Sequence, residues 1–401
     1  MRSKKLLLSL AAAVGLALGI PCLSASASVN GPSKDGKWYL REYEDNTISV
    51  SIQDKSVTEV EIPEVIDGHT ITMVEVDAFK DCEALRKVTI PKTVTVIEDY
   101  SFYNCSALEE VNIPENVHNI GFQAFYGCAK LESMEIPAAV DDIEAFAFEG
   151  CSSLKGVTVA AGNAAYKDEN GILFDKAGET LYLYPSAKTD ESYTVPASCK
   201  TIYDYAFIGN PYLKSVDISK IESLGEDAFY YCTALESITV PEGITELKGS
   251  VFGNCTALKS ASLPGTLTSI GESCFYNCLN LSAVEIPESV QTIGNYAFFN
   301  CPSLTSIHLT AAASTIGDYA LGWYFAGDEE KPVRLPDFEV DATNDTAAFD
   351  YCVKNSIKCT GGVTQNTFFL YILIGIVVLV IIITIIIIAV QKKIQKRYEI
   401  G

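Results

Sequence analysis

Thirteen cysteines are the residues of this 401-residue chain that could do the most varied chemistry. Cysteine thiolates form disulfides, bind metals and act as nucleophiles. Eight of them recur every 23 residues in two groups: Cys82, Cys105, Cys128 and Cys151, then Cys232, Cys255, Cys278 and Cys301. A regular spacing indicates packing positions, and a buried free cysteine behaves as a small hydrophobe. We therefore interpret these eight as reduced thiols of a core.

Other constellations for catalysis or metal binding are weak. The chain has no Cys-x-x-Cys pair, and the three histidines His69, His118 and His308 are scattered, whereas a zinc site needs clustered ligands. The segment "DENG" at 168–171 lacks the glycine position and the ligands of a calcium loop. We predict no cofactor, no metal, no catalytic residue and no enzymatic activity. Only Cys352 and Cys359, outside the repeat, remain open as either a disulfide or two thiols.

The 23-residue period is shared by several residue types, which points to a repeat architecture. Prolines end apolar segments at Pro91, Pro114, Pro137, Pro241, Pro264 and Pro287. Phenylalanines keep the same spacing at Phe79, Phe102, Phe125, Phe148, Phe229, Phe252, Phe275 and Phe298. This period lies in the range of leucine-rich repeats, in which each unit contacts only its neighbours.

The elements that position these residues can be read from one unit. Val111 and Ile113 stand two apart, so they point to one face of a short strand that the next proline ends. Phe125, Cys128 and Leu131 have helical spacing, which predicts a short helical turn with one inward face. A single unit cannot bury that face, so stacked units should form continuous ladders of phenylalanine and cysteine.

The sequence resembles the BspA-like leucine-rich-repeat family of surface proteins. The resemblance rests on motifs such as "IPENVHNIGFQAFYGCAKLESMEIP" and "IPESVQTIGNYAFFNCPSLTSIHL", and it covers roughly residues 38 to 360. Three departures stand out: Asn210 replaces the repeat cysteine, Cys274 replaces an alanine and Leu321 replaces a phenylalanine.

We predict an α/β repeat fold, a leucine-rich-repeat solenoid of about ten 23-residue coils with stacked parallel strands, short helical turns, a hairpin insertion and capping units. Asn170-Gly171 between alternating apolar segments is typical of a type I′ hairpin. The predicted organisation is a signal peptide (1–27), an N-terminal cap and first coil (28–75), a first repeat block (76–159), the hairpin insertion (160–195), a second repeat block (196–335), a C-terminal cap (336–360), a stalk (361–367), a transmembrane helix (368–390) and a cytoplasmic tail (391–401).

The two ends predict export and a membrane anchor. Basic residues, an apolar run and Ala25-Ser26-Ala27 are typical of a secretory signal peptide, and lipid attachment at Cys22 is a weaker alternative. Residues 368–390 carry no charge and are long enough to span a bilayer. Lysines and an arginine follow directly, so by the positive-inside rule the tail is cytoplasmic and the N-terminal bulk is outside the cell.

A binding surface is the remaining candidate for function. The net charge of −22 argues against nucleic acid as a partner, because binding phosphates takes lysine and arginine. Outward strand positions form a predicted binding face of small polar and acidic groups: Glu110, Asn112, Ser133, Glu135, Ser215, Asp217, Ser237, Thr239, Ser260, Ser262, Glu285 and His308.

We expect a bacterial cell-surface protein that mediates adhesion or protein–protein interaction through this solenoid. The family resemblance implies host matrix, host cells or other microbes as partners. The alternatives are a structural spacer of the envelope and a co-receptor without catalytic activity.

Overall fold

The computed structural model describes residues 29–326, 331–361 and 365–398. The predicted signal peptide, the alternative lipid site at Cys22 and part of the predicted stalk lie outside these ranges. Side chains of the C-terminal helix are described for residues 372–390.

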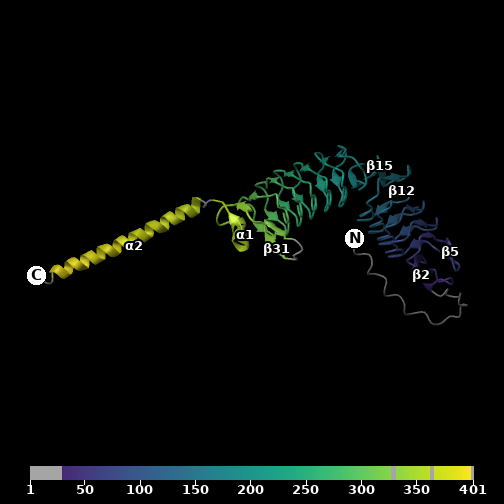
Figure 1. Cartoon of the computed structure of the whole chain (residues 1–401), viewed down its shortest axis with the longest axis horizontal. Helices are drawn as coiled ribbons and strands as arrows, with labels where there is room; N and C mark the ends of the chain where they lie inside the picture. Colours follow the sequence, from purple (N-terminus) through teal and green to yellow (C-terminus); the bar gives the residue numbers. More distant parts are fainter. Residues whose placement is uncertain (1–28, 327–330, 362–364, 399–401) are drawn as a thin grey trace, which may run out of the picture.

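The chain winds into a solenoid of about 13 turns with roughly 23 residues per turn (Figure 1). The predicted repeat fold is confirmed, and the number of turns exceeds ten because the caps and the insertion continue the winding. Each coil contributes one strand to each of two rows, and neighbouring coils pair in parallel at the equivalent position, as in Ser133↔Gly156 and Asn119↔Asp142.

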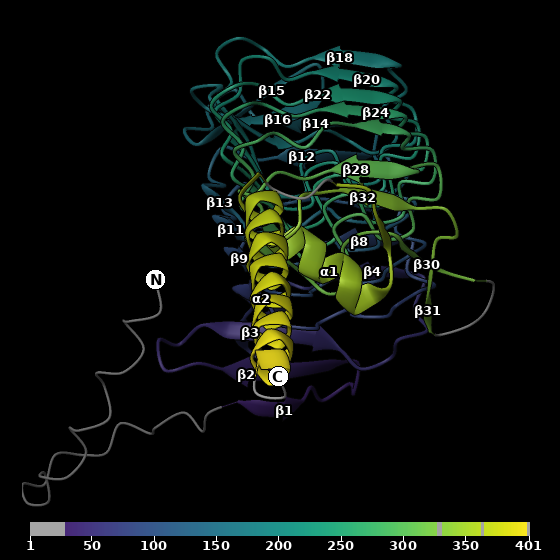
Figure 2. The same cartoon turned by 90° about the vertical axis from the view of Figure 1, so that its left-hand side faces the viewer.

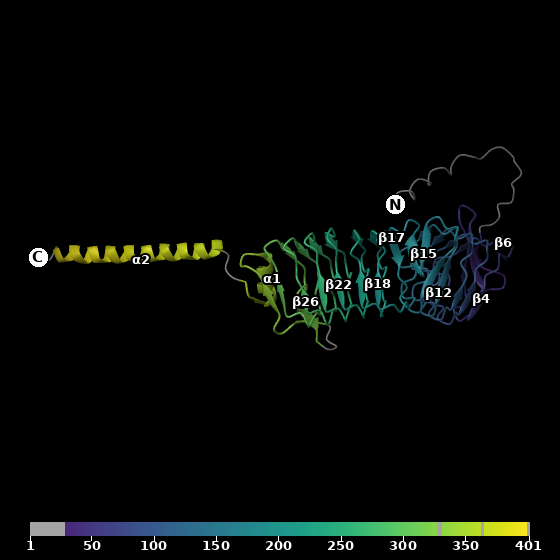
Figure 3. The same cartoon turned by 90° about the horizontal axis from the view of Figure 1, so that it is seen from above.

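The strands of the first row carry the outward positions described above, and Figure 3 shows them in file along the solenoid. They are β4 (Glu59–Glu61), β8 (Lys87–Thr89), β10 (Glu110–Val111), β12 (Ser133–Ile136), β14 (Gly156–Val159), β18 (Ser192–Thr194), β20 (Ser215–Asp217), β22 (Ser237–Thr239), β24 (Ser260–Ser262), β26 (Ala283–Val284), β28 (Ser306–His308), β32 (Glu339–Asp341) and β33 (Lys358–Cys359). We call this row the strand face.

The second row consists mostly of two-residue strands. They are β3 (Ile48–Ile52), β7 (Met73–Val74), β9 (Val96–Ile97), β11 (Asn119–Ile120), β13 (Asp142–Ile143), β17 (Thr180–Leu183), β19 (Thr201–Ile202), β21 (Ser223–Leu224), β23 (Glu246–Leu247), β25 (Ser269–Ile270), β27 (Thr292–Ile293) and β29 (Thr315–Ile316).

The remaining elements cap or interrupt the winding. Antiparallel strands β1 (Asn30–Pro32) and β2 (Trp38–Glu42) pair onto β3, and hairpins are formed by β5 (Val65–Ile66) with β6 (His69–Thr70), by β15 (Tyr166–Glu169) with β16 (Ile172–Asp175), and by β30 (Trp323–Phe325) with β31 (Pro332–Arg334). Helix α1 (Ala347–Asn355) begins at an N-cap hydroxyl of Thr346, and α2 (Gln365–Tyr398) follows it. Cys352 and Cys359 are free thiols in this structure, and their side chains are hydrogen-bonded to each other in this cap.

The predicted helical turns differ from what the structure shows. In the described part of the chain α1 and α2 are the only helices, and the Phe-x-x-Cys-x-x-Leu segments are successive hydrogen-bonded turns. Cys82 N–H bonds the Phe79 carbonyl and Leu85 N–H bonds the Cys82 carbonyl, but Phe79 N–H bonds Ser101 of the next coil (2.7 Å). Because these backbone N–H groups donate to carbonyls of the neighbouring coil, the segments cannot form the continuous i→i−4 hydrogen bonds of an α-helix.

Phenylalanine rings form two stacked columns inside the solenoid. The ring of Phe102 is nearly parallel to the rings of Phe79 and Phe125, and its centroid lies 5.0 Å and 5.2 Å from theirs. The same stacking runs from Phe207 to Phe298 in the second block. All eight predicted phenylalanines are buried, and offset stacking adds about 0.5–1.5 kcal/mol per pair to their burial.

The repeat cysteines pack beside these rings and also donate hydrogen bonds. Each thiol from Cys105 onward reaches the carbonyl of a phenylalanine one coil earlier, as Cys255 Sγ does to Phe229 O (3.2 Å) and Cys278 Sγ to Phe252 O (3.1 Å). A thiol therefore joins neighbouring coils as well as filling space. Burial raises the pKa of Cys151, Cys232 and Cys301 to about 12, so these thiols stay protonated.

Asn210 shows what the cysteine position requires. Its amide nitrogen donates to the carbonyls of Ser186 (3.2 Å) and Lys188 (3.0 Å), and its amide oxygen accepts from two backbone N–H groups. The preceding segment is the insertion instead of a regular coil, and Asn210 bonds its carbonyls where a repeat cysteine bonds a phenylalanine carbonyl.

Two positions in each coil adopt left-handed backbone conformations. One precedes the Ala-Phe pair, and the other precedes the cysteine, where asparagine, aspartate or glycine usually stands. Asn254, Asn277 and Asn300 have φ of 58°, 60° and 55°, and their side chains form a ladder with Asn277 Nδ2 2.7 Å from Asn254 Oδ1. Asparagine suits the position because it tolerates this conformation and bonds its equivalent in the next coil.

The hairpin insertion divides the interior into two hydrophobic cores. The first contains Trp38 to Leu173, and the second contains Ile172 to Cys352. Alternate residues of β16 enter different cores, since Leu173 joins the first while Ile172 and Phe174 join the second. Asn170 and Gly171 form the turn with φ of 54° and 80°, and Gly171 O accepts from Val157 N–H of β14 (3.0 Å). The insertion is thus a partition that both blocks pack against.

The left-handed backbone of the asparagine ladder predicts that glycine destabilises the protein less than alanine does when either replaces Asn277. Asn277→Ala and Asn277→Gly lose the same side-chain bonds, but only alanine is strained at φ of 60°. We expect the glycine variant to be about 1 kcal/mol more stable in denaturant unfolding. An alanine variant as stable as the glycine variant would show that the left-handed backbone does not select this residue.

The raised thiol pKa values predict protection from alkylation. At pH 8 a thiol of pKa about 12 is ionised in about one molecule in ten thousand, and burial blocks access to it. Iodoacetamide should leave the eight repeat cysteines unmodified in the native protein and modify all of them in guanidinium, as read by mass spectrometry. Native labelling of Cys255 or Cys278 at the denatured rate would contradict the closed core.

Candidate functional site

The structure places the predicted binding residues together on the strand face. They lie on or directly beside β10, β12, β20, β22, β24, β26 and β28, and between them stand buried residues such as Met134, Val216 and Ile238. All twelve are exposed except Ser260, which is half-buried. Figure 2 shows β18, β20, β22 and β24 stacked in register along this face.

Several of these residues already have partners within the protein. The Glu110 carboxylate lies 2.5 Å from Lys87 Nζ, and His308 Nδ1 lies 2.9 Å from Asp341 Oδ2. Asn112 bonds both the N–H and the carbonyl of Ile90 in the preceding coil, at 2.8 Å each. These side chains join neighbouring coils, which makes them less available to a ligand.

A hollow of about 480 Å³ lies over β18, β20 and β22. Four predicted residues line it: Ser215, Asp217, Ser237 and Thr239. Ser192, Tyr193, Thr194, Ser219 and Glu242 complete its polar lining, with Val216, Ile218 and Pro241. We call this hollow the strand-face groove. It lies at the first coil after the insertion, where β18 pairs with β20 alone and forms the edge of its sheet.

Several hydroxyls of the groove are unpaired. The side chains of Ser192, Thr194, Ser215, Ser237 and Thr239 make no hydrogen bond to another residue that the structure describes. The only charged groups in the lining are Asp217 and Glu242. Backbone and hydroxyl bonds from Ser219 lower the pKa of Asp217, so its carboxylate is ionised at neutral pH.

The groove includes residues that the sequence prediction missed. Ser192, Tyr193 and Thr194 were assigned to the insertion, yet they form the strand β18 in parallel register with β20. The signal was present, since "ESYTVP" at 191–196 has the pattern of "ESITVP" at 236–241. Of the twelve predicted residues, four line the groove and the others lie elsewhere on the face, while the groove also contains residues outside the prediction.

Among the described residues, no group of three or more His, Cys, Asp or Glu side chains is arranged to hold a metal ion. Within the same ranges, one helix is long and apolar enough to cross a membrane. It spans Ile372–Val390 with a mean hydropathy of 3.7 and no burial against the solenoid.

The repeat identifies the family. A model of the BspA type leucine rich repeat region matches six copies over residues 51–169 and 200–325, more than half of the chain. The interval between these ranges contains β16 and β17 of the insertion. A search of curated proteins finds no match.

Solved structures share the architecture. The pneumococcal vaccine antigen PcpA has a TM-score of 0.50 and 22% identity, over 82% of this chain and 96% of that one. A leucine rich cell surface protein from Faecalibacterium prausnitzii has 26% identity and a TM-score of 0.41, over 69% and 93%. A leucine-rich repeat protein from Eubacterium ventriosum has 22% identity and a TM-score of 0.43, over 63% and 90%. By its six repeat copies, the chain belongs to the BspA-type leucine-rich repeat family.

Proposed function

We propose that this chain is a cell-surface adhesion or interaction protein that binds an extracellular polypeptide in the strand-face groove. The observation that carries the proposal is the groove itself, about 480 Å³ lined by hydroxyls without partners in the described residues. A rigid parallel sheet holds these hydroxyls in register, so their ordering cost is already met before a ligand arrives.

The groove chemistry favours an extended polypeptide with neutral or basic side chains. Hydroxyls can donate to and accept from a peptide backbone, and β18 is a sheet edge along which a strand can lie. Asp217 and Glu242 disfavour acidic partners. We propose a binding role instead of a catalytic one, because the lining contains no histidine, lysine or cysteine, and the lowered pKa of Asp217 makes this carboxylate a weak base for the Ser219 hydroxyl that bonds it.

The membrane anchor is the second part of the proposal. Helix α2 has the length and composition of a membrane span, and Lys392, Lys393, Lys396 and Arg397 follow the apolar run. With the basic end in the cytoplasm, the solenoid lies outside the cell. A spacer of the envelope would use the same anchor, and self-association without any other ligand would favour that role.

Lysine substitutions test the groove. The full chain in lipid nanodiscs is exposed to matrix proteins, mucin, epithelial cells and whole bacteria. Ser215→Lys with Ser237→Lys adds two bulky charges to the groove, while Ser133→Lys with Ser306→Lys adds the same charges to exposed positions on β12 and β28. We expect the groove pair to weaken a saturable interaction at least about tenfold and the control pair to leave it unchanged.

Equal loss in both pairs would mean that the charge of the whole face decides binding. Saturable binding that neither pair changes would move the site elsewhere on the solenoid. A folded protein that binds only itself would replace the adhesion proposal with the structural one.

Truncation tests the anchor. Removal of residues 368–401 should release the protein from the membrane fraction, because burying about twenty apolar residues holds α2 in the bilayer. Removal of residues 391–401 alone keeps the apolar run and should leave the protein in that fraction. Retention of the longer truncation in the membrane would favour lipid attachment at Cys22.

A further inference from the structure

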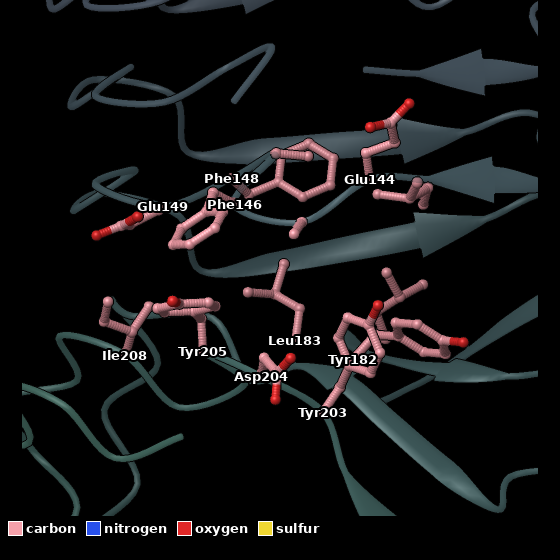
Figure 4. Close-up of a pocket in the computed structure, with 14 residues that line it drawn as sticks. Glu144, Phe146, Phe148, Glu149, Tyr182, Leu183, Tyr203, Asp204, Tyr205 and Ile208 are labelled. Carbon is pink, nitrogen blue, oxygen red and sulfur yellow. The ribbon is translucent and has the colours of Figure 1, made fainter. Parts of the chain in front are cut away.

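A second cavity lies on the other side of the solenoid, at the junction between the two repeat blocks. It is lined by residues around β13, by β16 and β17 of the insertion, and by the turn that follows β19. Figure 4 shows Glu149, Phe146, Tyr205 and Ile208 at one end, Glu144, Tyr182 and Tyr203 at the other, and Leu183 between them. The insertion creates this space because it replaces a regular coil that would fill it.

Aromatic rings and carboxylates are prominent in the lining of this cavity, which we call the junction cavity. Phe146 lies 3.8 Å from Tyr205 between ring centroids, and Tyr182 lies 4.7 Å from Tyr203. Glu144, Glu149 and Asp204 also line it, and no lysine, arginine or histidine does. Lys248 pairs with Asp204 (3.4 Å) but is not part of the lining.

Glu149 breaks a repeat pattern to stand in this cavity. Equivalent positions in the two preceding coils are Tyr103 and Tyr126, whose rings stack with centroids 4.7 Å apart. A tyrosine at 149 would continue that column. Instead, the Glu149 carboxylate is half-buried and makes no hydrogen bond or ion pair with another described residue.

This carboxylate is held at an energetic cost. Burial and the nearby Asp227 raise the pKa of Glu149 to about 7. Its other titratable neighbour is Tyr126, whose pKa the Glu149 carboxylate helps to raise, and Tyr205 hydrogen-bonds Asp227. Glu144, Asp204 and Tyr203 line the rest of the cavity. A desolvated carboxylate in an aromatic cavity is an arrangement that a bound cation would stabilise, and such perturbed groups concentrate at functional sites.

We propose that the junction cavity binds the side chain of a lysine presented by an extracellular polypeptide. The ammonium would meet Glu149 and the faces of the aromatic rings, and its methylenes would lie along Leu183 and Ile208. The cavity of about 50 Å³ has room for one or two water molecules at about 30 Å³ each, which suits an amine head and excludes a sugar ring. The proposal concerns a site separate from the strand-face groove, so each can fail without the other.

The test uses the full chain in nanodiscs and Nα-acetyl-lysine N-methylamide as the probe. Saturation-transfer NMR should show contact of the protein with the ε-methylene of the probe at pH 8. Glu149→Gln removes the charge at constant size, Glu149→Tyr fills the cavity, and Glu272→Gln removes an exposed carboxylate elsewhere. We expect both Glu149 variants to bind the probe at least about tenfold more weakly, and the Glu272→Gln variant to bind it with the affinity of the unaltered protein.

Two further arms identify the chemistry. The Nε-acetylated probe keeps the shape and loses the charge, so it should not bind. Cadaverine carries ammonium groups without a peptide, and tighter binding of cadaverine than of the blocked lysine would overturn the assignment to a polypeptide. Equal signals from the charged and the acetylated probe would overturn the proposed lysine site. Equal signals from the unaltered protein and both Glu149 variants would overturn it as well.

Stability against pH supplies an independent readout. A carboxyl with a raised native pKa keeps its proton in the folded state while the unfolded chain releases it, so stability falls as pH rises from about 4.5 to 7. Glu149→Gln should therefore melt at a higher temperature than the unaltered protein at pH 8, and the difference should shrink at pH 4.5. A lower melting temperature at pH 8 would show that the carboxylate is already stabilised and would overturn the proposal.

Discussion

Hydrogen bonding between equivalent positions of neighbouring coils is the interaction on which the rest of this structure depends. The amide of Phe102 bonds Ala124, that of Phe125 bonds Ala147, and that of Phe252 bonds Cys274, each across one turn of the solenoid. These bonds consume the amides that a helix would use, and they hold the phenylalanine rings at stacking distance. The thiols add a third contact of the same kind. Each coil is therefore stable only between two others, which is why both ends carry caps.

An architecture that depends on repetition acquires special sites where the repetition stops. At the insertion, β16 contributes to two cores, and the regular cysteine is replaced by Asn210, whose amide bonds carbonyls of the insertion. Both cavities lie at this junction, the strand-face groove beside the edge strand β18 and the junction cavity beside Glu149. The break in the repeat therefore adjoins both of the concave surfaces to which we assign binding.

The two proposed sites use different chemistry on different sides of the solenoid. The groove offers fixed hydroxyls along a sheet edge, whereas the junction cavity offers rings and a desolvated carboxylate. Both are acidic or neutral, in keeping with the net charge of −22.

The sequence by itself determined the winding, because a 23-residue period in four residue types leaves one way to bury Phe125, Cys128 and Leu131. It also located the hairpin at Asn170-Gly171, since local turn chemistry requires no distant partner. Only the tertiary structure decided that the predicted helical turns are not helices, because their amides bond another coil. It alone showed that Asn112 and Glu110 are occupied while Ser215 and Ser237 are not, and that Glu149 faces a cavity. These facts depend on contacts between residues 22 or more positions apart, which a pattern of residue types does not encode.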